Sequence, residues 1–281
     1  MSEVDPLLID ATTKIFEDLS DPQTLNSAGN DDWRSTLWSA LEESGLTLAW
    51  VPADNGGSGA SLADGFSILE LAGKFAVPIP LAETLLAGWL LSKSKLKCPS
   101  GMMTVAPTRP RDKIHLTDNN TLVGEVFGIP FANVAENIVV LAHKDDTPHI
   151  ALVSAKDCII KSNPGLSGDG RDTITFTDTI PIQIHAASEN FSAQELCLMG
   201  ATVRSMQMSG ALQSILKLAT DYAQERVAFE KQISKFQAVQ HNLAKLASET
   251  AVAIAAAGSA MDTINNAEPV SYTHLTLPTK A

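Results

Sequence analysis

Cysteine is scarce in this sequence, and its arrangement argues against two common uses of the residue. The three cysteines, Cys98, Cys158 and Cys197, lie far apart and form no CxxC pair. Disulfide frameworks and cysteine zinc sites both need more cysteines at closer, regular spacings. We therefore expect reduced thiols, in the core or on the surface, and no metal site.

Long apolar runs and concentrated positive charge are missing as well. No segment of about 18 or more uninterrupted apolar residues occurs, so we expect no membrane span. The N-terminus MSEVDPLLIDATTK has no basic start followed by an apolar stretch, so we expect no secretory signal and a cytoplasmic protein. The 20 basic and 32 acidic residues give a net charge of −12. Without a basic stripe, this balance argues against a nucleic-acid partner.

The sequence does contain three segments of different periodicity. Its 281 residues, 44% of them hydrophobic, are enough for more than one domain. Apolar residues recur at helical spacing over residues 3–97, whereas residues 102–186 contain short β-branched runs separated by turn residues. The helical period returns at Phe191. Three pairs have the pattern of a helix capping box, namely Ser61 with Asp64, Ser192 with Glu195, and Ser234 with Gln237.

This pattern predicts an α+β chain in the order helical domain, small β domain and helical domain. We place an N-terminal all-α domain at 1–98, a middle β-barrel or β-sandwich domain at 99–190, and the start of a C-terminal helical bundle at 191–268. The helical period stops after Pro269. The tail at 269–281 is interpreted as foreign sequence, and we expect the native protein to continue beyond residue 268.

Between the two C-terminal helical segments lies the stretch ERVAFEKQISKFQAVQHNLA, residues 225–244. It resembles the acyl-CoA dehydrogenase family, whose pattern there is roughly E-R-x-x-F-G-x-x-I-x-x-F-Q-x-x-Q. The order of helical and β segments over residues 1–268 is similar to that family too. So is the stretch WVPADNGGSGASLADGFSILELAGKFAVPIPLAETLL at 50–86, which looks most like the branch acting on sterol side chains and other bulky acyl groups.

The resemblance implies an FAD shared between subunits. Arg226, Phe229 and Gln237 would then hold the ADP half of an FAD bound mainly by another subunit, with Phe236 as a weaker lining residue. A guanidinium suits the pyrophosphate, a helix N-terminus attracts the same anion, and an amide both donates and accepts. The residues alone leave a structural alternative, in which Arg226 pairs with a carboxylate, Phe229 is core and Gln237 caps its helix. The family glycine after the phenylalanine is Glu230 here.

The family's reaction removes a proton from the carbon α to a thioester and passes a hydride from the β carbon to the flavin. A carboxylate acts as the base. In most members the base would lie beyond residue 268, and in others at the position of Gly200, so we expect no catalytic residue in this chain. The segment VAPTRPRDKIHLTDNN at 105–120 also lacks the family's Thr-Glu-Pro motif, which contacts flavin and substrate.

Two functions follow from the resemblance. The first is an FAD-dependent acyl-CoA dehydrogenase of fatty acid or sterol catabolism, a homo- or heterotetramer that uses an acyl-CoA substrate and an electron-transfer acceptor. The second is a non-catalytic partner subunit that completes the FAD site of a heteromeric acyl-CoA dehydrogenase. A helical scaffold without a cofactor remains a third alternative. Arg204, within an apolar helix, either neutralises a buried acid or contacts substrate.

Overall fold

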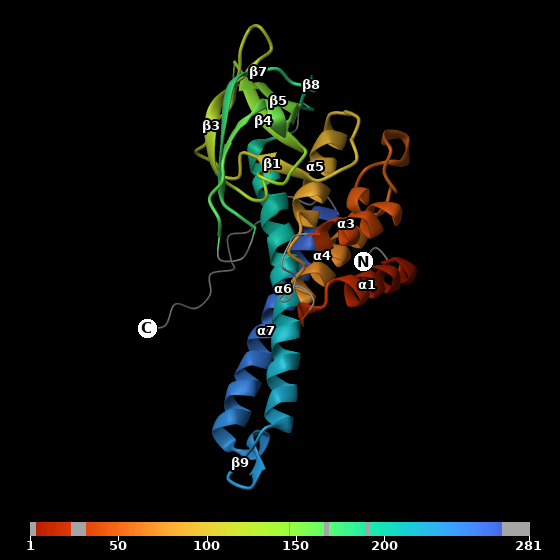
Figure 1. Ribbon diagram of the computed structural model, residues 1–281, viewed down its shortest axis with the longest axis vertical. Coiled ribbons are helices and arrows are strands. Elements are labelled where there is room, and N and C mark those ends of the chain that lie inside the picture. Colours follow the sequence, from red (N-terminus) through yellow and green to blue (C-terminus); the bar gives the residue numbers. More distant parts are fainter. Residues whose placement is uncertain (1–3, 24–31, 146, 166–168, 189–190, 266–281) are drawn as a thin grey trace.

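The computed structural model describes residues 4–23, 32–145, 147–165, 169–188 and 191–265. Its N-terminal part is a cluster of helices beside the long C-terminal pair (Figure 1). The α-helices of this cluster are α1 (Pro6–Leu19), α3 (Asp32–Glu43), α4 (Leu62–Lys74) and α5 (Leu81–Lys93). Short 3-10 turns at Leu46–Leu48 and Ala53–Asn55 connect α3 to α4. The predicted tail at 269–281 lies outside the described residues, and the domain boundaries stay predictions.

The predicted capping box at the start of α4 is confirmed. Ser61 Oγ accepts a hydrogen bond from the backbone N–H of Asp64 (3.1 Å), and Asp64 Oδ2 accepts from the backbone N–H of Ser61 (3.0 Å). Asp64 Oδ1 also accepts from the backbone N–H of Asp5 at 2.9 Å. Because Asp5 caps α1, this carboxylate joins the first turns of two helices.

The middle part is one sheet whose order is β6-β7-β3-β2-β4-β5-β8, with β1 also paired to β4. Both β1 and β2 run parallel to β4, and the other pairs are antiparallel. All eight strands lie within the segment 102–186 in which the sequence predicts short β-branched runs, although the sequence gives no signal for the three-residue strand β6. The strands are β1 (Met103–Ala106), β2 (His115–Leu116), β3 (Leu122–Ile129), β4 (Asn137–Lys144), β5 (Thr147–Ser154), β6 (Ile159–Lys161), β7 (Asp172–Thr179) and β8 (Gln183–Ala186).

The central strand β4 is buried on both faces, which explains its continuous apolar sequence. Val139 and Leu141 belong to the core shared with the helices, whereas Ile138, Val140 and Ala142 belong to a separate core inside the β domain. Successive side chains of a strand point to opposite faces, so this alternation places one face of the sheet against the helices. Helix α5 contacts β1, β4 and β5 from that side.

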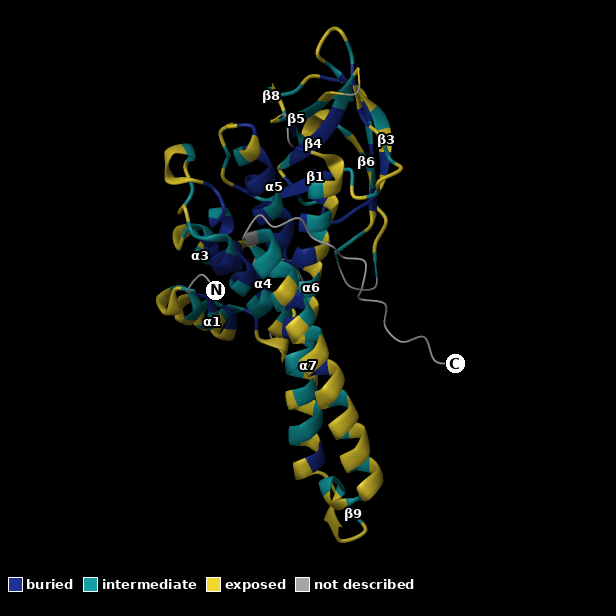
Figure 2. Ribbon diagram, turned by 180° about the vertical axis from the view of Figure 1, so that it is seen from behind, coloured by how far each residue is buried: buried dark blue, intermediate teal, exposed yellow. Residues whose placement is uncertain are grey.

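The C-terminal part is an antiparallel helical hairpin that extends well beyond the other elements (Figures 1 and 2). Helix α6 (Ala193–Glu225) has 33 residues and α7 (Gln237–Asn265) has 29. Ser192 caps α6, as predicted, by accepting from the backbone N–H of Glu195 at 3.2 Å. The predicted box at Ser234 and Gln237 is wrong, because Ser234 lies in a 3-10 turn and α7 begins only at Gln237.

Glycines on both helices allow α6 to pack closely against α4. A Cβ atom added to Gly210 would lie 1.8 Å from the carbonyl oxygen of Glu70, and one added to Gly73 would lie 1.9 Å from that of Gln207. Only residues without a side chain fit at such a contact between backbones. Of the helices in the described part of the chain, none is long and apolar enough to cross a membrane.

Candidate functional site

The turn that joins α6 to α7 forms the tip of the helical hairpin. Its strands β9 (Val227–Ala228) and β10 (Lys231–Gln232) pair antiparallel and leave a two-residue loop of Phe229 and Glu230. These two residues have φ values of +51° and +63°. Positive φ at both central positions is the mark of a type I′ turn, in which glycine or asparagine is favoured. Glu230 therefore adopts a strained conformation at the position where the resembled pattern has glycine.

The tip displays its aromatic and cationic side chains to the outside. Phe229 is 91% exposed, which rules out the core alternative, and its ring meets that of Phe236 edge-on at a centroid distance of 6.3 Å. Lys231 Nζ lies 4.3 Å from the centroid of the Phe236 ring. Arg226 ends α6 with an exposed side chain that forms no ion pair within the described ranges, and Gln237 is exposed at the start of α7. All four predicted cofactor residues thus lie at one end of the molecule.

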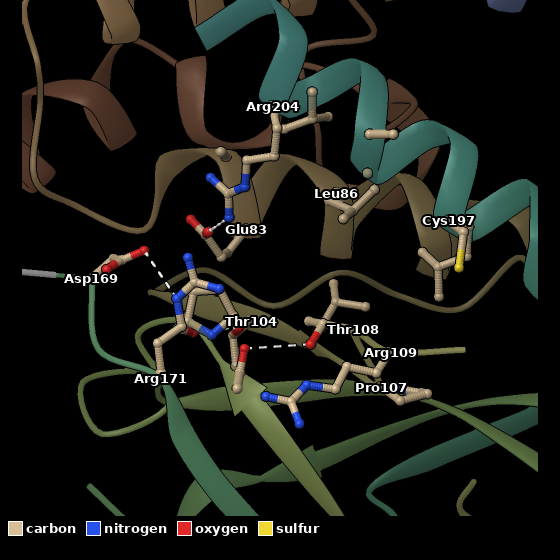
Figure 3. A pocket seen from close by; sticks show the side chains of 18 of the residues that line it. Glu83, Leu86, Thr104, Pro107, Thr108, Arg109, Asp169, Arg171, Cys197 and Arg204 are labelled. Carbon is tan, nitrogen blue, oxygen red and sulfur yellow. Dashed lines mark hydrogen bonds and ion pairs between the residues drawn. The ribbon is translucent and has the colours of Figure 1, made fainter. Parts of the chain in front are cut away.

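A second candidate site is a cavity of about 460 Å³ where α5, the first part of α6 and the β domain meet (Figure 3). Its polar wall includes Glu83, Arg204 and Arg109, together with Asp169 and Arg171. The apolar wall consists of Leu86, Val105, Pro107, Pro110, Leu196 and Val203. Residues of the segment 105–120, which lacks the Thr-Glu-Pro motif, therefore help to build this cavity.

An ion pair crosses one end of the cavity. Glu83, in the first turn of α5, is only 5% exposed, and its Oε1 atom accepts from Arg204 Nη2 on α6. Arg204 Nη1 donates to Gln207 Oε1 at 2.6 Å. The neighbouring Glu83 carboxylate raises the pKa of Arg204, so the guanidinium stays charged. The prediction that Arg204 neutralises a buried acid is confirmed. Because Arg204 also lines the cavity, contact with a substrate remains open.

Gly200 lies in the wall of the same cavity. It is the position at which some members of the resembled family would carry the base, and glycine has no side chain to take a proton. A Cβ atom there would meet only Leu86 Cδ2, at 3.8 Å, so space is not the reason for the missing side chain. Sequence reasoning missed Glu83, although a single acid within an otherwise apolar helix is a signal for a buried partner.

Residues 192–277 match the family described as the acyl-CoA dehydrogenase C-terminal domain. Acyl-CoA dehydrogenase IpdE2 of Mycolicibacterium smegmatis is 24% identical over 250 residues, which are 88% of this chain and 73% of that protein. The C-terminal part of this chain therefore belongs to the acyl-CoA dehydrogenase family. The match confirms the resemblance read from the tip motif, and that family is one of flavoproteins that typically bind FAD.

Solved structures show the same fold. The Tcur3481-Tcur3483 steroid ACAD superimposes with a TM-score of 0.79 at 23% identity, over 92% of this chain and 77% of the solved chain. The ChsE4-ChsE5 complex from Mycobacterium tuberculosis gives a TM-score of 0.76 at 19% identity, over 92% and 78% of the two chains. The α+β architecture with helices before and after a β domain is therefore the acyl-CoA dehydrogenase fold. Both similar structures are named as pairs of proteins.

Proposed function

We propose that this acyl-CoA dehydrogenase family chain works as a subunit of an FAD-dependent enzyme that introduces an α,β double bond into an acyl-CoA thioester. The single observation that supports this most strongly is the tip, where Arg226, Phe229 and Gln237 are displayed together at the end of a protruding hairpin. A side chain exposed to 91% contributes little to its own fold. Covering a phenylalanine ring yields roughly 1.5–3 kcal/mol, which is available to a partner or ligand.

The chemistry of the tip fits the ADP half of FAD. The Arg226 guanidinium supplies a permanent charge and a planar donor set for the pyrophosphate, and the first turn of α7 points its N–H groups toward an anion at the same end. The ring of Phe229 is free to stack on the adenine. When bound, FAD supplies the acceptor for the substrate's hydride, and further electron transfer goes to a separate acceptor.

The cavity fits the acyl group of the substrate. Its mostly apolar wall takes hydrocarbon, and the buried ion pair between Glu83 and Arg204 fixes where polar atoms of a ligand are tolerated. Proton removal at the α carbon needs a carboxylate that Gly200 does not provide. Glu83 is a poor choice for this base because it is engaged with Arg204. We therefore propose that the base comes from another subunit or from a residue outside the described part of the chain.

The glycine in the cavity wall favours a second candidate function. A subunit without a base near Gly200 and without the Thr-Glu-Pro segment could complete the FAD site of a catalytic partner while performing no chemistry itself. The pairing of proteins in the similar steroid ACAD and ChsE4-ChsE5 structures is in line with this alternative. The two functions predict different behaviour of the isolated chain.

Purification of the chain, alone and co-expressed with a second acyl-CoA dehydrogenase subunit as candidate partner, separates these functions. The flavin absorbance per polypeptide and the oxidation of short, long and sterol-derived acyl-CoA thioesters by an artificial acceptor are measured. Flavin and turnover in the homomer support the enzyme. Flavin and turnover only in the co-expressed complex support the partner subunit. Absence of flavin in both preparations would contradict the proposal.

A further inference from the structure

The three cysteines of the chain lie in different surroundings. Cys98 and Cys158 are partly buried, and burial is the main cause that raises the pKa of each thiol to about 12. Cys197, in the second turn of α6, is exposed and lines the cavity between α5, α6 and the β domain. A cysteine reacts as its thiolate and only where a reagent reaches it. Among the three, Cys197 is therefore the one placed to react with an electrophile that is bound in the cavity.

Cys197 shares one face of α6 with the polar end of the cavity. Residues three, four and seven positions apart lie on the same face of a helix, so Cys197, Gly200 and Arg204 line the cavity together. In Figure 3 the side chains of Cys197 and Arg204 project from α6 toward the same space. Seven residues span about 10 Å of helix. A ligand of that length, held beside Arg204, therefore reaches the thiol.

The polar end of the cavity is independent evidence that this space takes a ligand. The Glu83 side chain is 5% exposed, and its Oε1 atom accepts from Arg204. Its Oε2 atom is buried and meets no hydrogen-bond donor within the part of the chain that the structure describes. A buried carboxylate oxygen without a donor is costly, and a bound ligand can supply the missing hydrogen bond. The thiol of Cys197 thus lies in the wall of a ligand site.

The charges in the wall suit a thioester that is attacked by sulfur. Arg204 pairs with Glu83, and Arg171 Nε lies 4.0 Å from Asp169 Oδ2. Arg109 lines the same cavity and forms no ion pair among the described residues, so the wall carries one uncompensated positive charge. Addition of a thiol to an α,β-unsaturated thioester moves negative charge onto the thioester oxygen. A guanidinium nearby stabilises that charge through charge-assisted hydrogen bonds.

We propose that Cys197 is a covalent capture site for α,β-unsaturated acyl thioesters held in this cavity. The sulfur of Cys197 forms a bond to the β carbon while the π bond between the α and β carbons breaks, and the thiol proton ends on the α carbon. The step needs no oxidant and no further reactant, and it leaves a thioether that fills the cavity. Such thioesters are the product class of the proposed function, on which the inference rests. Capture therefore retains product in the subunit and blocks the site.

The test follows bond formation by mass spectrometry instead of turnover. The chain, with its partner subunit where flavin retention requires one, is incubated with trans-2-octenoyl-CoA or with saturated octanoyl-CoA. We expect a mass gain of one octenoyl-CoA, located at Cys197 by peptide mapping, and a rate that saturates with probe concentration because binding precedes bond formation. Octanoyl-CoA should give no adduct. Cys98 and Cys158 should react at least about tenfold more slowly, since they are partly buried.

Two glycine variants show whether the cavity is needed for the reaction. Gly200→Leu fills part of the cavity, and a Cβ atom there would meet only Leu86 Cδ2, at 3.8 Å, so the variant should fold. We expect adduct formation to slow at least about tenfold, as for a loss of roughly 1.4 kcal/mol in binding. Alkylation of Cys197 by iodoacetamide, which needs no binding site, should change less than about threefold. Gly258→Leu on α7 is the matched control, because it lies outside the cavity and should leave both rates unchanged.

The inference is overturned if no adduct forms at Cys197, if all three cysteines react equally, or if the rate rises linearly with probe concentration. An adduct rate that Gly200→Leu leaves unchanged overturns it as well. The flavin content of the same preparation is measured separately. If flavin is retained and no adduct forms, the proposed function stands and the capture site fails. If the adduct forms but no preparation holds flavin, the capture site stands and the proposed function fails.

Discussion

The two halves of α6 lie in opposite surroundings. Up to Gly210 the helix packs against α4 and α5, with Gly210 in close contact with α4, whereas the part after Gly210 and helix α7 expose large apolar side chains (Figure 2). The exposed residues of these two stretches are Ile215, Leu218, Tyr222, Val252 and Ile254. One helix therefore serves two purposes. Its first half completes the core of this chain, and its second half presents an exposed apolar surface of the kind that marks interaction sites.

The same substitution should change the stability of the protein by very different amounts in the packed core and at the exposed tip. Phe66 is fully buried in α4, with its ring 5.0 Å from that of Trp50, whereas Phe229 is 91% exposed. We expect Phe66→Ala to lower the free energy of unfolding by about 3–5 kcal/mol. Phe229→Ala should change it by less than about 0.5 kcal/mol. Urea unfolding followed by circular dichroism measures both. A comparable loss for Phe229→Ala would show that the tip is part of the core.

Two glycines allow the stability effects of a substitution on a packed and on an open helix surface to be compared. Gly210→Ala forces a Cβ atom into the carbonyl of Glu70, so we expect destabilisation of about 1–3 kcal/mol. Gly258→Ala in α7 meets no atom within 4 Å, and should stabilise the helix by roughly 0.5–1 kcal/mol through its helix propensity. Thermal melting of the two variants in one buffer gives the comparison. Similar shifts in the same direction would contradict the observed helix packing.

The capping box tests a polar contact of the helical cluster. Burial of Asp64 raises its pKa, but hydrogen bonds from Asp5 and Ser61 outweigh this and hold the pKa below the ordinary value of 3.8. The unfolded chain then binds the proton more readily, so the stabilisation is present above pH 3.8 and is lost as the pH falls below it. Asp64→Asn should cost about 1 kcal/mol at neutral pH. Its stability should also fall less steeply in acid, as measured by unfolding at pH 7 and pH 3.

The strained turn offers an effect that is confined to the tip. Glu230→Gly should relieve a positive φ at little entropic cost and stabilise the hairpin by about 1 kcal/mol. It also removes a negative charge from the proposed pyrophosphate site, so FAD should dissociate more slowly. Glu230→Gln is the control, because it removes the charge and keeps the strain. A faster loss of FAD from both variants would contradict the assignment of the tip.

Much of this arrangement could be predicted from the sequence because it is local. Periodicity gave the order of helices and strands, and the confirmed box at Ser61 depends on residues only three positions apart. Strand β6 was missed because three residues show no alternation. The type I′ turn was missed because Phe229 and Glu230 lack the glycine or asparagine that normally marks it. The contact between Glu83 and Arg204 joins residues 121 positions apart, so only the fold brings it about.

The central claim is that the tip of the hairpin holds part of an FAD. The most direct test is the amount of FAD per polypeptide that remains after gel filtration of the flavin-retaining preparation, compared with that of the Arg226→Ala, Phe229→Ala double variant. We predict stoichiometric FAD in the unmodified protein and a loss of most of it in the variant, with unchanged circular dichroism. Full retention of FAD by a folded double variant would contradict the account.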